Sequence, residues 1–256
     1  MLGLEFPDIN EVIRWVDLWP TFNKIAIIAC AATIIGTTLF LMAARADPLQ
    51  APRGVRNLVD IVVEFIEGII METIGKDGLK WTPMMLSFFI FIYLCNVQGI
   101  IPIIYMPATA RMAIPLFLAV LVWFIYNGVG IKEQKLGYLT HMLWPPGVPV
   151  LMKPLVGLIE FVSNILLRPF ALAIRLFANM LAGHMLLVTF AILTEELIST
   201  GNIFGIVLSV LPFGMLMFIT AFEVLVGFLQ AYIFTILACV FIGSSMATHD
   251  EHAEAH

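Results

Sequence analysis

Residues 154–194 read PLVGLIEFVSNILLRPFALAIRLFANMLAGHMLLVTFAILT, a run of 41 residues that is almost entirely apolar. A second apolar run, residues 202–248, follows after the short loop EELISTG. As helices, both would be about 60 Å long or more, roughly twice the thickness of a bilayer core. A modest tilt cannot absorb such an excess. We therefore expect two long antiparallel membrane helices that are either steeply tilted or broken into pieces.

The composition of the whole chain agrees with this reading. Of its 256 residues, 61% are hydrophobic and 12% charged, whereas soluble domains carry roughly 25% charged residues. Mean hydropathy is +1.01. The apolar runs are continuous and not alternating, so the sequence predicts an all-α polytopic membrane protein. A net charge of −5 argues against nucleic acid as a partner, and the three widely spaced cysteines predict no metal site.

Five transmembrane segments and one amphipathic surface helix follow from the charge pattern. The spanning segments are expected at 25–44, 83–105, 112–131, 154–195 and 203–247, and the amphipathic helix at 57–74. In the amphipathic helix, polar residues recur every three or four positions opposite valines and isoleucines. Because Asp60, Glu64 and Glu67 make its polar side acidic, we favour a protein contact over attraction to anionic lipid.

Lysines and arginines predict the orientation of the chain. Residues 45–80 and 132–153 contain eight of them, whereas the loops of the opposite side contain three. By the positive-inside rule, these two loops and the C-terminal tail face the cytoplasm or its equivalent, with the N-terminus outside. The N-terminus is acidic and has no basic n-region, so we expect no cleaved signal peptide.

The last two segments contain five ionisable residues in an apolar setting: Glu160, Arg168, Arg175, His184 and Glu223. A charge at the bilayer centre costs roughly 2.5–3.5 kcal/mol on insertion scales, so such residues are functional candidates. Glu160 and Arg168 lie nearer the helix entrance, where they could pair or extend to water. Arg175 lies deeper and has no acidic residue within ten positions. For His184, a purely structural role remains the alternative.

Helical spacing sorts these residues into faces and depths. Arg168, Arg175 and Asn179 share one face, whereas His184 lies about 180° from Arg175. An antiparallel hairpin puts Arg175 level with Gln230, and His184 level with Glu223. Gln230 cannot neutralise a guanidinium, and arginine stays protonated in proteins, so we expect another chain to supply its countercharge. His184 and Glu223 have the chemistry of a proton relay.

These segments resemble subunit a of the F-type ATP synthases. The resemblance is carried by RLFANMLAGH (175–184), GFLQAYIFTIL (227–237), LLRPFALAIRLFANM (166–180) and CNVQGIIP (95–102), and the five-segment layout agrees over nearly the whole chain. It implies that Arg175 is the stator arginine that faces the rotor ring. It also implies that Asn179, His184, Glu223 and Gln230 lie at the rotor interface or along the outer half-channel.

Other matched positions have less specific implications. Glu160 and Arg168 resemble polar positions of the cytoplasmic half-channel, and Asn96 and Gln98 resemble positions near the outer one. Some members of the family carry a carboxylate where this chain has Gly99.

The resemblance also implies partners and a setting. Expected partners are a ring of c subunits, the b subunits of the peripheral stalk, the soluble catalytic head reached through that stalk, and the lipid bilayer. The chain needs no cofactor or nucleotide site and is not an enzyme by itself. A bacterial plasma membrane is the favoured location, with mitochondrial or plastid membranes as the alternative.

Two other function classes compete with this interpretation. A proton-coupled secondary transporter could also contain buried arginine and His/Glu relays, but such folds usually show internal repeats, and none is visible here. A structural membrane scaffold would not need the intramembrane charges. Within the favoured interpretation, the coupling ion could be sodium instead of a proton.

Overall fold

The computed structural model describes residues 24–45, 54–100, 107–134 and 152–246. This part of the chain contains helices and no strand, which confirms the all-α prediction, and five helices are long and apolar enough to cross a membrane. The N-terminal stretch, most of the loop before Lys153 and the C-terminal tail lie outside the described residues. The elements are α2 (Lys24–Ala44), α3 (Val55–Thr73), η1 (Lys76–Trp81), α4 (Thr82–Gln98), η2 (Ala108–Ala110), α5 (Ala113–Gln134), α7 (Lys153–Val162), η3 (Ser163–Leu167), α8 (Arg168–Ser199) and α9 (Ile203–Met246).

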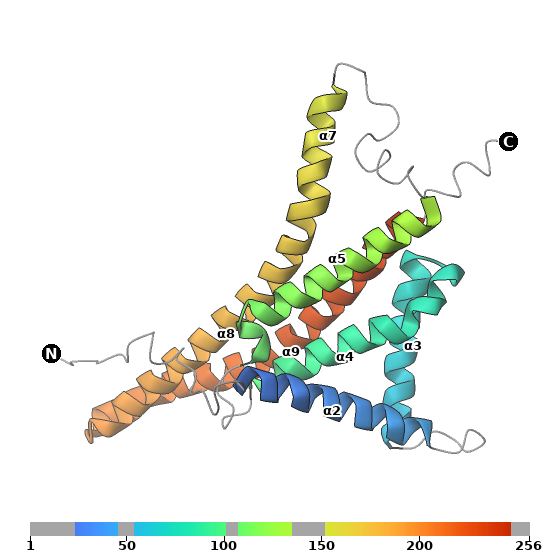
Figure 1. Cartoon of the computed structure of the whole chain (residues 1–256). Helices are drawn as coiled ribbons and strands as arrows, with labels where there is room; N and C mark the ends of the chain where they lie inside the picture. The colour runs from blue at the N-terminus through green and yellow to red at the C-terminus, as the bar shows by residue number, and fades with distance from the viewer. Residues whose placement is uncertain (1–23, 46–53, 101–106, 135–151, 247–256) are drawn as a thin grey trace.

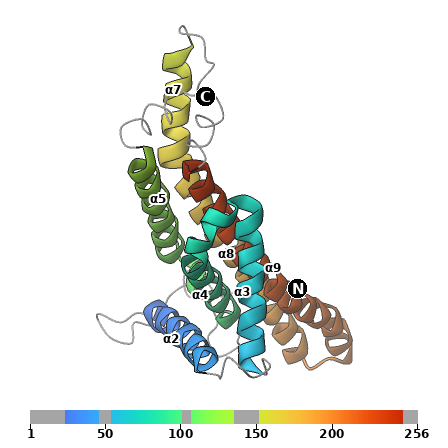
Figure 2. The ribbon, with the colours of Figure 1, turned by 90° about the vertical axis from the view of Figure 1, so that its right-hand side faces the viewer.

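Helices α8 and α9 form a long hairpin that extends beyond the other helices (Figures 1 and 2). Its turn contains Gly201 at φ 66°, a left-handed conformation that glycine adopts at no steric cost. At Gly205, an added Cβ atom would lie 2.7 Å from the carbonyl oxygen of Leu197. Glycine at both positions therefore lets α9 begin close against the end of α8.

The first of the two long runs is one continuous helical run that bends at a π turn, so it does not break into the separate pieces that the sequence offered as one alternative. The five residues Ser163–Leu167 form a π-helical turn between α7 and α8, and α7 diverges from α9 on the other side of this turn (Figure 1). In the turn, the backbone N–H of Arg168 bonds to the carbonyl of Ser163. Pro169 has no N–H to continue the α-helical ladder, and π turns and prolines are common causes of helix kinks.

Helix α4 ends at Gln98, whereas the sequence suggested a helix continuing to residue 105. Residues 101–106 lie outside the described part. A Cβ atom added at Gly99 would clash with Pro107. The chain thus returns so closely against Gly99 that a side chain there would displace Pro107.

Small residues bring α9 close to α4. A Cβ atom added at Gly227 would lie 3.2 Å from the Cβ of Asn96. Ala231 and Ala238, on the same helix as Gly227, are fully buried. Lipid is as apolar as leucine, so membrane helices associate through such close van der Waals packing and through hydrogen bonds. One such bond joins the two helices, from Asn96 Nδ2 to the carbonyl of Gly227 at 3.3 Å.

The amphipathic helix α3 turns its apolar side toward this chain. Val59, Ile66 and Ile70 are buried, and Phe65 packs against Phe89 of α4 and Tyr232 of α9 at ring-centroid distances of 5.8 and 5.7 Å. One part of the apolar side is thus buried within the chain, whereas Leu58, Ile61 and Met71 of the same helix are exposed.

Candidate functional site

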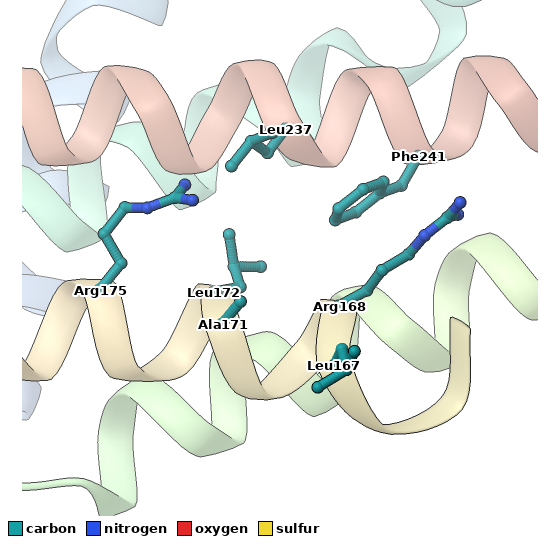
Figure 3. Close-up of a pocket in the computed structure, with 7 residues that line it drawn as sticks. All are labelled: Leu167, Arg168, Ala171, Leu172, Arg175, Leu237 and Phe241. Atoms are coloured by element: carbon teal, nitrogen blue, oxygen red, sulfur yellow. The ribbon is translucent and has the colours of Figure 1, made fainter. Parts of the chain in front are cut away.

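Arg175 projects from α8 toward α9 and lines a cavity of about 240 Å³ (Figure 3). The other lining residues are almost all apolar: Leu167, Arg168, Ala171, Leu172, Leu237 and Phe241. Among the described residues, Arg175 has no hydrogen bond and no ion pair. The structure therefore holds a permanent positive charge, half-buried, without a countercharge from this part of the chain.

Arg168 lies two turns before Arg175 and is held differently. Its guanidinium carbon is 5.4 Å from the centroid of the Phe241 ring, a distance at which a cation is attracted to the π face. Leu172 lies between the two arginines along α8 (Figure 3). The cavity thus contains one cation stacked on an aromatic ring and one that is free to meet an anion.

Gln230 contacts Asn179 and not Arg175. Asn179 Nδ2 donates a hydrogen bond to Gln230 Oε1 at 2.9 Å, and Gln230 is only 2% exposed. Asn179 lies about one helical turn beyond Arg175. The sequence placed Gln230 at the depth of Arg175. In the structure, Gln230 instead forms a hydrogen bond with Asn179 that joins α8 to α9 about one turn beyond the arginine.

His184 and Glu223 lie at adjacent levels of the hairpin, and each is 5% exposed. Glu223 packs against Gly183, where an added Cβ atom would lie 2.7 Å from Glu223 Oε1. The second carboxylate oxygen, Oε2, is buried without a hydrogen-bond partner among the described residues. A buried carboxylate with an unsatisfied oxygen is costly, and such sites are typical of groups that receive and release protons.

Gly183→Ala is expected to disturb the Glu223 carboxylate without removing it. The added methyl group must push Oε1 aside, and overpacking of this kind typically costs about 1–3 kcal/mol. We expect the free energy of unfolding of the protein to fall by an amount in this range. The matched control is Gly214→Ala on α9, where an added Cβ meets nothing within 4 Å. Equal stability of the two variants would show that the space at Gly183 has no bearing on Glu223.

Asn96 and Gln98 lie at the end of α4 and differ in how they are satisfied. Asn96 Oδ1 accepts a hydrogen bond from Thr109 Oγ1 at 2.6 Å, in addition to the bond that its Nδ2 donates to Gly227. Gln98 is 7% exposed, and its Nε2 has no partner among the described residues. Asn96 is thus fixed as a link between α4, η2 and α9, whereas Gln98 retains a free donor.

Glu160 is held by a residue that the sequence did not single out. Asn164 Nδ2 donates to Glu160 Oε2 at 3.1 Å. The backbone carbonyl of Asn164 accepts bonds from Tyr126 Oη at 2.9 Å and Trp123 Nε1 at 3.2 Å, both from α5. Asn164, Trp123, Tyr126 and Thr109 were all missed by sequence reasoning. For Asn164, Trp123 and Tyr126, the only sequence feature that pointed to this site was Pro169, which lies five positions after Asn164.

Comparison with known proteins gives a consistent result. The sequence model of the family described as ATP synthase A chain matches residues 25–243. The chain is 38% identical to ATP synthase subunit a of Parafrankia sp. over 98% of its own length and 87% of that protein. It is 40% identical to ATP synthase subunit a of Frankia alni over 88% of its length and 77% of that protein. For the subunit a of Rhodopseudomonas palustris, the identity is 39% over 88% of both chains.

These relatives are bacterial, and the chain contains five helices of membrane-spanning length, so it is a multi-pass protein of a bacterial plasma membrane. The resemblance found in the arginine and glutamine motifs is confirmed over nearly the whole chain. The chain belongs to the ATP synthase A chain family, whose members are the a subunits of the membrane sector of ATP synthases.

Proposed function

We propose that this chain is the stator of a proton channel, in which Arg175 separates two offset half-channels that serve the carboxylates of a rotor ring. The observation that carries the proposal is the isolation of Arg175: a guanidinium in an apolar cavity with no hydrogen bond or ion pair to the described residues. A permanent cation in such a setting stabilises an anion brought to it from another chain. A passing carboxylate must therefore lose its proton to move beyond Arg175.

The two half-channels are assigned to opposite sides of Arg175 along the membrane helices α7, α8 and α9. A proton enters from outside through the region of His184 and Glu223, neutralises a rotor carboxylate and travels with the ring. It leaves through the region of Glu160 and Arg168, which opens to the cytoplasm. Asn179 and Gln230, hydrogen-bonded at 2.9 Å, hold α8 and α9 together between Arg175 and the His184/Glu223 level. Asn96 and Gln98 of α4 are the other candidates for the outer half-channel. Of the two, Gln98 has a side-chain N–H group without a partner among the described residues, which can donate a hydrogen bond along this path.

The energy available to this process is set by the membrane potential. Each proton that crosses gains about 2.3 kcal/mol per 100 mV. In the proposed complex, that energy turns a ring of c subunits, while b subunits of a peripheral stalk hold this chain against the soluble catalytic head. ATP is made in the head, so the chain acts without a nucleotide site or a cofactor and is not an enzyme by itself.

A photo-crosslinking experiment tests the position of the ring. Ala178 is exposed on α8, three residues beyond Arg175, and Phe117 is 66% exposed on α5. A photoreactive amino acid at position 178 is expected to crosslink to a small ring subunit in native membranes, whereas the same group at position 117 is not. Crosslinking of neither position, or of both equally, would contradict the stator role and favour a transporter that works without a ring.

A further inference from the structure

The carbonyl of Asn164 cannot be satisfied by its own helix. In an α-helix, it would accept the N–H of Arg168, but that N–H bonds to Ser163 in the π turn. The next residue along the chain, Pro169, has no N–H to donate. Within a bilayer, no water is available to replace the missing donor, so a neighbouring helix must supply it.

Helix α5 supplies two donors from one face. Trp123 and Tyr126, three positions apart, donate to the Asn164 carbonyl at 3.2 and 2.9 Å. A carbonyl oxygen has two lone pairs, so both bonds can form at once. Tyr126 is only 2% exposed, so its hydroxyl group has little access to lipid or water. The π turn between α7 and α8 is thus stabilised by side chains of another helix.

Contacts link Trp123 and Tyr126 to Glu160 and Arg168, the two charged residues of the proposed cytoplasmic half-channel. Asn164, fixed through its carbonyl, donates its side-chain N–H to Glu160 at 3.1 Å. The Tyr126 ring packs against Phe241 with 5.6 Å between centroids, and Phe241 is the ring on which Arg168 is stacked at 5.4 Å. One contact path therefore leads from α5 to Glu160, and another leads to Arg168.

We propose that Trp123 and Tyr126 are positioning residues of the cytoplasmic half-channel. Both side chains hold the π turn at Asn164 and thereby place Glu160 and Arg168 relative to Arg175. This inference rests on the proposed proton-transfer function, since it assigns these residues to one half of the channel. Both act through Asn164 and Phe241.

The test removes the donors and keeps an aromatic ring at each position. Tyr126→Phe and Trp123→Phe, alone and together, are assayed for ATP-driven proton pumping in inverted vesicles that contain the whole complex. Loss of one ordinary hydrogen bond predicts a decrease of about fivefold for each single variant. Two matched controls lose no such bond. They are Tyr93→Phe, whose hydroxyl has no bond to the described residues, and Trp81→Phe, whose Nε1 is buried without a partner among them.

A second substitution separates positioning from general loss of stability. Pro169→Ala supplies a backbone N–H five positions after Asn164, the spacing of the π turn. In that background, Tyr126→Phe is expected to leave pumping almost unchanged, because the carbonyl has a donor again. An equal fold-decrease in both backgrounds would overturn the proposal.

The geometry is measured independently of pumping. Spin labels at Leu158 on α7 and Leu186 on α8, both exposed, are placed in the purified complex after replacement of Cys30, Cys95 and Cys239. We expect the distance distribution across the π turn to shift in the double variant Trp123→Phe/Tyr126→Phe. An unchanged distribution would overturn the role in the bend, and a shifted one with native pumping would overturn the role in the channel. A failure of the proton-channel function itself would appear separately, as normal pumping by Arg175→Ala.

Discussion

Arg175→Ala is expected to abolish ATP-driven proton pumping while the complex still assembles. Opposite unit charges about 4 Å apart attract by about 4 kcal/mol at an effective dielectric constant near 20, and each 1.36 kcal/mol is a factor of ten. Removal of the guanidinium should therefore lower pumping in inverted vesicles by about a thousandfold. Because the described residues give Arg175 no partner of their own, the substitution leaves no unpaired anion behind in this part of the chain.

The same variant makes a second, opposite prediction. If Arg175 separates two half-channels, its loss connects them, and the passive proton leak through vesicles stripped of the soluble head should rise. The control is Lys132→Ala, which removes an exposed cation at the end of α5 and should change neither pumping nor leak. Normal pumping together with normal leak in Arg175→Ala would rule out the stator role and favour the alternative of a proton-coupled transporter.

Much of the fold could be predicted from the sequence because membrane segments are defined by length and charge. Helix α2, at Lys24–Ala44, lies within one residue of the expected segment at both ends, since Lys24 and Arg45 bound an uncharged run. Helix α3 was visible from the spacing of its acidic residues. The excess length of the run at 154–194 required either a tilt or a break, but length alone could not choose between them.

The choice between tilt and break depends on contacts between helices. The π turn at Ser163–Leu167 is stabilised by donors from α5, more than thirty residues earlier in the chain, so Pro169 is the one local sign of it and does not identify the donors. The partner of Gln230 was missed for a related reason. Positions of equal depth can be counted from a sequence, whereas the choice of Asn179 over Arg175 depends on helix rotation and side-chain rotamers. The Cβ-free space at Gly183 that accommodates Glu223 is likewise visible only in three dimensions.

Glu223→Gln is expected to stop proton uptake without opening a leak. The amide has the size of the acid but cannot bind or release a proton near neutral pH, and a positioned acid or base typically contributes about 10²–10⁴-fold to a proton transfer. We therefore expect pumping in inverted vesicles to fall by about a hundredfold. Passive leak after removal of the head should stay at the native level, because Arg175 still separates the half-channels. Glu195→Gln, at an exposed position near the end of α8, is the matched control.

The sign of the leak distinguishes the two variants more sharply than the loss of pumping does. A general failure of packing would reduce pumping in both, whereas the proposed geometry requires a raised leak for Arg175→Ala and an unchanged leak for Glu223→Gln. Glu223→Asp adds a further check, since the shorter side chain keeps the acid but moves it away from Gly183. Partial pumping by Glu223→Asp and none by Glu223→Gln would assign the effect to the carboxyl group. Native pumping by Glu223→Gln would remove Glu223 from the proton path and leave His184 and Gln98 as the remaining outer candidates.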